Sequence, residues 1–136
     1  MGYLLDSNIV SYFLKKITPV NNKLRQVTLR GDGIFISCIT YYEVKRGLLS
    51  INATRQLADF QQFCSDYGIL FLDDIAIIEK ACEIHVDLRR RGLTIQEQDI
   101  LIAATAIIRD LILVSNDSDL LKVPEVKLEN WLIAES

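Results

Sequence analysis

Short apolar runs alternate along this chain with longer stretches in which apolar residues recur every three to four positions. The short runs cover residues 3–5, 34–37, 69–72, 111–114 and 126–128. Their length and their content of β-branched and aromatic residues predict strands. Strands that are apolar without alternation are typical of a parallel sheet that is covered on both faces.

The longer stretches have the spacing of amphipathic helices. We expect helices over residues 9–15, 21–29, 40–49, 53–67, 74–91 and 94–109. Pro19 separates the first two helices, and Gly92 ends the fifth. Either Asp73 or Asp74 is the expected cap at the start of that fifth helix.

Strands that are separated by helices and joined by right-handed crossovers predict an α/β fold. We expect a three-layer α/β/α domain around a central parallel sheet of about four to five strands. The length of 136 residues predicts one domain that covers residues 1–136. No apolar run approaches the ~20 residues that a membrane span requires, so we expect no membrane partner.

Composition and charge limit the classes of binding partner and the compartment that we expect for this protein. A net charge of −3 and a pI near 5.1 argue against binding nucleic acid through a basic surface alone. Carboxylates that hold cations would change this, because the metal then supplies the positive charge. Cys38, Cys64 and Cys82 are odd in number and have no CxxC spacing. They predict buried free thiols in a reducing compartment, and hence a cytoplasmic protein.

Four carboxylates are predicted to meet at one edge of the sheet. In an open α/β sheet, sites form beyond the carboxyl ends of the strands. Asp6 follows the first strand, Asp117 comes three residues after the fourth, and Glu43 lies in the first turn of the helix after the second. Asp99 joins them because its helix leads almost directly into the base of the fourth strand. That helix must therefore begin at the same rim.

Three of these positions also have a purely structural interpretation. Asp6 can cap the helix that follows it, and Thr40 and Glu43 have the spacing of a T-x-x-E capping box. Asp117 and Asp119 lie in NDSD, whose residues are common in turns. Either of these two aspartates can be the fourth acid, and we prefer Asp117 because it stands nearer the strand end.

Asp99 is the carboxylate that a structural role explains least well. It lies in QDILIAATAII, with Ile95, Ile102 and Ala103 on its own helical face, at the margin of an apolar stripe. Burying an unpaired carboxylate is costly, and no Lys or Arg lies within one turn of Asp99 on that helix. A bound metal ion explains this position better.

The ligand chemistry favours a hard divalent cation. Carboxylate oxygens suit Mg²⁺ or Mn²⁺, whereas zinc would require a cluster of His or Cys that the sequence lacks. His85 is the only histidine, and we expect it at the surface or boundary of a long helix and not as a base or metal ligand. Thr94 and Glu97 form a second T-x-x-E spacing, to which we assign a structural role only.

The four acidic segments together resemble the signatures of the PIN-domain ribonucleases. They are YLLDSNI, ITYYEVKRG, QDILIAATA and LILVSNDSDL. The length and the closing VPEVKLENW are most similar to the VapC toxins of toxin–antitoxin pairs. The resemblance implies Mg²⁺- or Mn²⁺-dependent cleavage of RNA, a homodimer and an inhibitory cognate antitoxin. It assigns the catalytic and metal-binding positions to Asp6, Glu43, Asp99 and Asp117. The last motif departs from the family pattern, because Leu120 stands where an aromatic residue is common.

In such a site, a metal-activated water is expected to attack phosphorus in line. Asn8 and either Ser115 or Asn116 are candidate donors that would orient the acids, and each can equally be a cap or turn residue. Lys45 and Arg46, one turn from Glu43, are candidate contacts to the RNA backbone.

Two further features concern the surface. Arg89, Arg90 and Arg91 end a helix, where cations suit the helix dipole, and this interpretation is preferred over an RNA contact. Residues 11–14 and 41–49 carry more apolar side chains than one sheet face needs. This surplus predicts an isologous dimer.

Other classes of protein compete with a nuclease. A receiver-like signalling domain also gathers aspartates at such a rim, but it needs a lysine after the last strand, where this chain has Asn116 and Asp117. A phosphatase of the haloacid-dehalogenase type needs Asp-x-Asp after the first strand, and Asn8 stands at the second position. The alternative is a PIN-like or receiver-like binding domain without nuclease activity, and metal titration would distinguish it from the enzyme.

Overall fold

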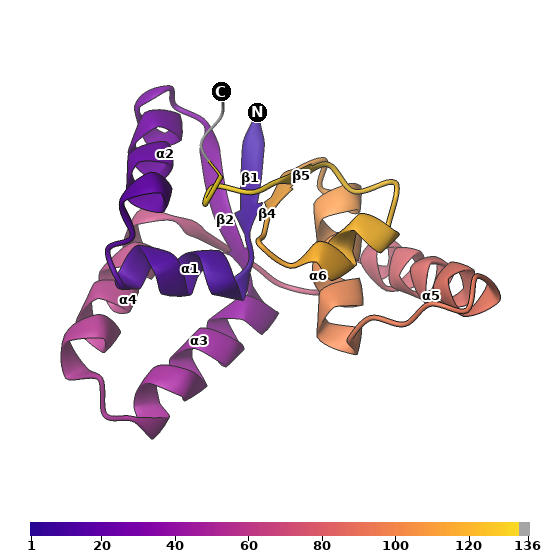
Figure 1. Ribbon diagram of the computed structural model, residues 1–136, viewed down its shortest axis with the longest axis horizontal. Coiled ribbons are helices and arrows are strands. Elements are labelled where there is room, and N and C mark those ends of the chain that lie inside the picture. The colour runs from indigo at the N-terminus through magenta and orange to yellow at the C-terminus, as the bar shows by residue number, and fades with distance from the viewer. Residues whose placement is uncertain (134–136) are drawn as a thin grey trace.

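The computed structural model describes residues 1–133, and the last three residues of the predicted domain lie outside the described residues. Helices cover both faces of a parallel sheet with the order β3-β2-β1-β4-β5 (Figure 1). The strands are β1 (Gly2–Leu5), β2 (Gly33–Ser37), β3 (Gly68–Leu70), β4 (Ile112–Val114) and β5 (Leu128–Glu129). The predicted three-layer α/β/α fold with a parallel sheet is confirmed.

Two groups of helices form the outer layers, and Figure 1 shows them on opposite sides of the sheet. The first layer consists of α1 (Ser7–Leu14), α2 (Thr18–Leu29), α3 (Cys38–Ser50) and α4 (Thr54–Asp66). The second layer consists of α5 (Ile75–Arg90) and α6 (Glu97–Ile108), with the short 3₁₀ helix η1 (Ser118–Lys122) after β4.

The central strand β1 sends its side chains alternately into two cores. Leu5 is fully buried in the core under the first layer, whereas Leu4 is fully buried in the core under α5 and α6. This alternation follows from the two-residue period of a strand. Because both faces are apolar, β1 has no solvent-exposed side, and its carboxyl end is fixed at the middle of the sheet edge.

Most predicted elements are present, with shifted ends. Helix α2 begins at Thr18, three residues before the prediction, because Pro19 lies in its first turn, where a missing N–H costs nothing. Strand β5 begins at Leu128, two residues later than predicted, and part of the loop predicted after β4 is the helix η1. Asp74 caps α5, as one of the two predicted candidates, through a 2.9 Å hydrogen bond from the Ala76 N–H.

The three cysteines are free, as predicted, but their predicted burial is only partly right. Cys38 and Cys64 are partly buried, whereas Cys82 is exposed on α5. Within residues 1–133, the helices are too short or too polar for any of them to cross a membrane.

The sheet edge that carries the site is fixed by backbone pairing. Leu5 pairs with Val114, and the Asp6 N–H donates to the Val114 carbonyl over 2.9 Å. This pairing sets Asp6 beside Ser115 at the carboxyl ends of two neighbouring strands. On the other side of β1, strand β2 continues into α3 without a loop, so the first turns of α3 rise from the same edge.

Candidate active site

Asp6 is both a helix cap and a buried side chain at the sheet edge. Only 5% of the residue is exposed, and each carboxylate oxygen accepts a hydrogen bond. The Ser7 N–H donates to Oδ1 over 2.8 Å, and the Ser115 hydroxyl donates to Oδ2 over 2.7 Å. Burial raises the pKa of Asp6 against these two hydrogen bonds, and the charges of Glu43 and Asp117 raise it further.

Glu43 is not part of a capping box, so this structural interpretation is wrong. Ser37 caps α3, because its hydroxyl accepts the Ile39 N–H over 3.1 Å, and the helix starts two residues before Thr40. Glu43 points instead to α1, where its Oε1 accepts the Ser7 hydroxyl over 2.8 Å. Thr40 is fully buried, and its hydroxyl has no hydrogen-bond partner within residues 1–133.

Asp117 and Asp119 differ in their surroundings. The Asp117 N–H donates to the Ser115 hydroxyl over 3.0 Å, so this residue is tied to the donor that holds Asp6. The Asp117 carboxylate accepts the Asp119 N–H over 2.9 Å at the start of η1. Asp119 forms a 2.9 Å ion pair with Lys122. Asp117 is thus bound into the same hydrogen-bonded chain as Asp6, whereas Asp119 already has a cation beside it.

Asp99 lies in the first turn of α6 and faces the other acids. Desolvation and the charges of Asp6, Asp117, Glu43 and Asp119, in decreasing order, raise the pKa of Asp99 to about 6. Within residues 1–133 its carboxylate receives neither a hydrogen bond nor a cation, in contrast to Asp6. The four predicted acids therefore lie near enough to one another for their charges to interact.

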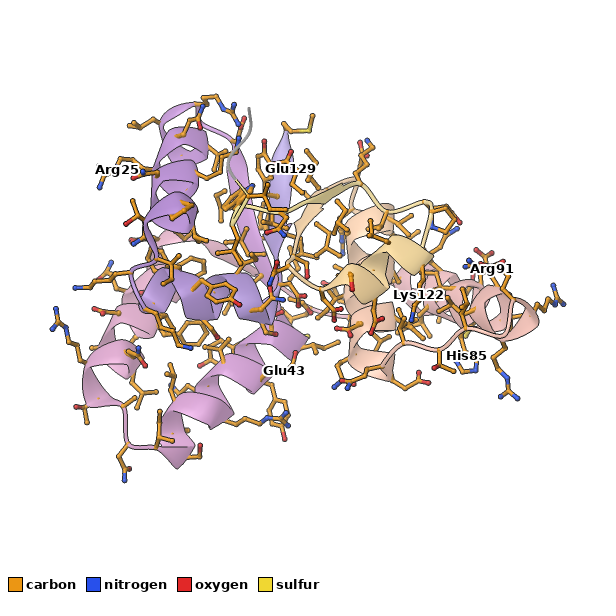
Figure 2. The ribbon with its side chains drawn as sticks, in the orientation of Figure 1. Arg25, Glu43, His85, Arg91, Lys122 and Glu129 are labelled. Carbon is orange, nitrogen blue, oxygen red and sulfur yellow. The ribbon has the colours of Figure 1, made fainter. Side chains whose placement is uncertain are left out.

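The second predicted capping box, at Thr94 and Glu97, is also wrong. Helix α6 begins at Glu97 with Gln96 in the cap position, so Thr94 lies in the preceding loop. Glu97 lies 3.5 Å from the imidazole of His85, measured from Oε1 to Nδ1. Figure 2 shows His85 on α5 and Arg91 directly after this helix, both far from Glu43, and so His85 lies outside the acidic site, as predicted.

Ser7 is a functional neighbour that sequence reasoning missed, whereas Ser115 was one of the candidate donors. Ser7 bonds Asp6 through its N–H and Glu43 through its hydroxyl, and so connects two of the acids. Its place directly after Asp6 was a usable signal. The other candidate donors act on each other, because the Asn116 N–H donates to the Asn8 side chain over 3.4 Å.

The donor chemistry of this edge fits a hard divalent cation. All four acids supply carboxylate oxygens, which are the ligands that Mg²⁺ and Mn²⁺ prefer. Their charges repel one another, as the raised pKa values of Asp6 and Asp99 show. Within residues 1–133, no three His, Cys, Asp or Glu side chains are placed so that they could hold a metal ion together. A cation would therefore have to draw these carboxylates closer together.

Comparisons with known proteins show the family of this chain. A family model described as the PIN domain matches residues 3–126. Ribonuclease VapC2 of Haemophilus influenzae is 33% identical over 134 residues, which cover 97% of this chain and 99% of the relative. Ribonuclease VapC2 of Rickettsia felis is 29% identical over 139 residues, which cover 96% of this chain and 98% of the relative.

The fold of a solved relative is closely similar. The crystal structure of VapBC2 from Rickettsia felis, bound to a DNA fragment from its promoter, contains a chain that superimposes with a TM-score of 0.88 at 28% sequence identity. The match covers 96% of this chain and 99% of that one. Family model, relatives and fold agree over nearly the full length, and the chain therefore belongs to the PIN domain family and, within it, to the VapC ribonucleases.

Proposed function

We propose that this protein is a Mg²⁺- or Mn²⁺-dependent endoribonuclease in which Asp6, Glu43, Asp99 and Asp117 are the catalytic acids and the metal ligands. The observation that carries the proposal is the state of Asp99. Its carboxyl faces the charges of the other acids without a donor or cation, and its pKa is raised to about 6. A divalent cation would offset this repulsion, and the relatives named ribonucleases point to RNA as the substrate.

Two serines, Ser7 and Ser115, orient the carboxylates that would bind the cation. Ser7 and Ser115 hold both oxygens of Asp6, so this carboxylate has one fixed orientation. The Ser7 hydroxyl sets the direction of Glu43, and Ser115 fixes the backbone of Asp117. When bound, the cation supplies positive charge for the phosphate and activates water for hydrolysis. The prepared orientation reduces the reorganisation needed for cation and substrate to bind.

The test is cleavage of a pool of cellular RNA with Mg²⁺ or Mn²⁺ by the wild type and by Asp6→Asn and Asp99→Asn. Both substitutions are nearly isosteric, and Asn caps a helix about as well as Asp. If Asp6 were only a cap, cleavage would be retained. We expect cleavage to fall to the level of a protein-free control while circular dichroism shows a native fold.

A matched control is Asp66→Asn, because Asp66 is an exposed aspartate at the end of α4 that accepts a hydrogen bond from Gln62. It should cleave RNA like the wild type. Retained activity in a folded Asp6→Asn or Asp99→Asn variant would contradict the assignment of the metal ligands. A folded wild type that binds no metal and cuts no RNA would favour the alternative, a PIN-like binding domain without nuclease activity.

We also propose a cognate antitoxin as the protein partner, because a close relative in fold was solved as VapBC2. The proposed homodimer rests on exposed apolar side chains. Of the predicted surplus in residues 11–14, Phe13 packs on Phe63 and Leu14 is buried, so this segment is used inside the fold. In the other predicted segment, residues 41–49, Tyr42 and Leu49 are 61% and 53% exposed. Along α5, which was not part of the prediction, Ile75, Ile78 and Val86 are 70%, 36% and 42% exposed. Light scattering of the wild type and of Ile78→Asp would test whether this stripe holds two copies together.

A further inference from the structure

Helix α3 carries an exposed aromatic side chain next to Glu43. Tyr42 is 61% exposed, and the Arg46 guanidinium lies 4.8 Å from the centre of its ring. This distance is within the range of a cation–π contact. The pair is therefore an ordered, solvent-facing surface that combines an aromatic ring with a positive charge.

The spacing of the residues sets this pair at the wall of the acidic site. Ile39, Tyr42, Glu43 and Arg46 follow the order i, i+3, i+4, i+7 and so form one strip along α3. Ile39 packs against the core that contains the α6 side chains, so the strip is on the side of α3 that faces α6. Figure 2 shows Glu43 near the centre of the molecule, between the first layer and α6.

The neighbouring cation Lys45 lies on the other side of the helix. Its amino group is 5.9 Å from the centre of the Tyr41 ring, and Tyr41 packs against Phe60 with 5.5 Å between ring centres. Phe60 belongs to the core under the first layer. Of the two cations that the sequence suggested as RNA contacts, Arg46 is therefore the one on the strip with Glu43.

We propose that Tyr42 and Arg46 form a nucleotide subsite that selects single-stranded RNA, an inference that rests on the proposed function. The base of an unpaired nucleotide next to the cleaved phosphate stacks on the Tyr42 ring. Arg46 holds that ring and pairs with an adjacent phosphate, which offsets the negative charge of the four acids. Aromatic rings bind splayed-out bases of single strands, whereas bases inside a duplex are already stacked on each other.

The test uses a single-stranded RNA oligonucleotide that the wild type cleaves at one mapped bond, and versions with an abasic nucleotide on either side of that bond. Loss of one stacked base should lower kcat/KM of the wild type about 5- to 100-fold at one of the two abasic positions. Tyr42→Leu should show a loss of this size on the intact oligonucleotide and no further loss on the abasic one. Tyr42→Phe keeps the ring and should behave like the wild type.

Leu49→Ala is the matched control, because Leu49 lies two turns after Tyr42 on the same helix and is 53% exposed. It should leave kcat/KM unchanged. Equal cleavage of intact and abasic oligonucleotides by the wild type would overturn the subsite. So would the loss of a dimer in light scattering together with lost cleavage in both Tyr42→Leu and Leu49→Ala, because a second copy would then cover this face.

Binding of the same oligonucleotides without divalent cations separates this inference from the proposed function. Fluorescence anisotropy measures it, and the wild-type protein serves even if a variant fails to fold. An abasic penalty that depends on Tyr42, in a protein that cuts no RNA, would contradict the nuclease and support the subsite. Cleavage that depends on Asp99 but shows no abasic penalty would contradict the subsite and leave the nuclease intact.

Discussion

Asp6 and Asp99 lie on two sides of the proposed site, and their carboxylates differ in burial and in hydrogen bonding. On the side of β1 and β4, Asp6 is almost fully buried, but both its oxygens accept hydrogen bonds. On the side of α6, Asp99 is only partly buried, yet desolvation and then the like charges of the other acids raise its pKa to about 6. Within residues 1–133 no donor or cation at its carboxylate offsets these two effects. At this site, hydrogen-bond donors thus affect the pKa of a carboxylate more than its exposure does.

The difference suggests separate roles in the proposed site. Asp6 is the fixed ligand, whose orientation is set before a cation arrives. Asp99 is the proposed ligand whose ionised form is destabilised in the metal-free fold, because no donor offsets its desolvation and the like charges near it. Binding of a cation would therefore stabilise the ionised form of Asp99. This difference between the two carboxylates can be measured through the stability of the metal-free protein and through its affinity for Mn²⁺.

Ser115→Ala should have the largest effect on the free energy of unfolding. It removes the hydroxyl donor from a buried carboxylate and the acceptor from the Asp117 N–H. We expect a loss of about 1 to 3 kcal/mol in urea denaturation without divalent cations, because a buried charged acceptor is left unsatisfied. Ser118→Ala, at an exposed position of η1, is the control and should change stability by less than about 0.5 kcal/mol. Equal stabilities of the two variants would show that Asp6 does not depend on its donor.

Asp99→Asn should act in the opposite direction. The pKa of the Asp99 carboxyl is raised from the ordinary value of 3.8 to about 6. The folded state therefore binds this proton more tightly than the unfolded chain does. Stability of the metal-free wild type should therefore fall as pH rises from about 4 to about 6, and the loss should persist above that window. Asn cannot ionise, so the variant escapes this loss.

At about pH 7.5 we expect metal-free Asp99→Asn to exceed the wild type by about 1 kcal/mol, a figure reduced from the full shift because the side chain is partly exposed and screened. At about pH 4 the two should be equal. Denaturant titrations at both pH values measure the difference, with Asp66→Asn as the control. A variant that gains nothing at the higher pH would mean that Asp99 is not under electrostatic stress.

Ser7→Ala should have a smaller effect than Ser115→Ala. Its hydroxyl makes one partly buried hydrogen bond, to Glu43, and the backbone N–H that Ser7 donates to the Asp6 carboxylate stays in place. We expect a loss of about 0.5 to 1.5 kcal/mol, and less than that of Ser115→Ala measured in parallel. Ser7→Thr keeps the hydroxyl and should restore stability. A larger loss than in Ser115→Ala would reverse the proposed order of the two donors.

Much of this fold could be predicted from the sequence. Continuous apolar runs such as 34–37 and 111–114 predicted buried parallel strands, and their positions along the chain set Asp6, Glu43 and Asp117 at one edge. Asp99 required one further step, from the short connection between its helix and β4. These inferences succeeded because local patterning and the tertiary fold agree in this chain.

The two capping boxes were predicted wrongly because each helix begins at a different residue than expected. The T-x-x-E spacing at Thr40 and Glu43 is a valid local signal, but Ser37 caps α3 earlier and frees Glu43 to reach α1. At Thr94, the helix starts later, after Gln96. The bond from Ser115 to Asp6 joins residues 109 positions apart and depends on the register of β1 and β4. Such contacts are set by strand pairing, which the sequence of neither segment encodes by itself.

Whether the four carboxylates bind a divalent cation is tested by calorimetric titration of Mn²⁺. The titrant is added to metal-free wild type, Asp99→Asn and Asp66→Asn at about pH 7.5. If the four carboxylates are the metal ligands, the wild type and Asp66→Asn should bind Mn²⁺ with the same affinity. Removing the Asp99 charge should weaken that affinity at least about tenfold, which corresponds to about 1.4 kcal/mol. A wild type that binds no Mn²⁺ would contradict the proposed metal site. An affinity that Asp99→Asn leaves unchanged would show that Asp99 is not a metal ligand.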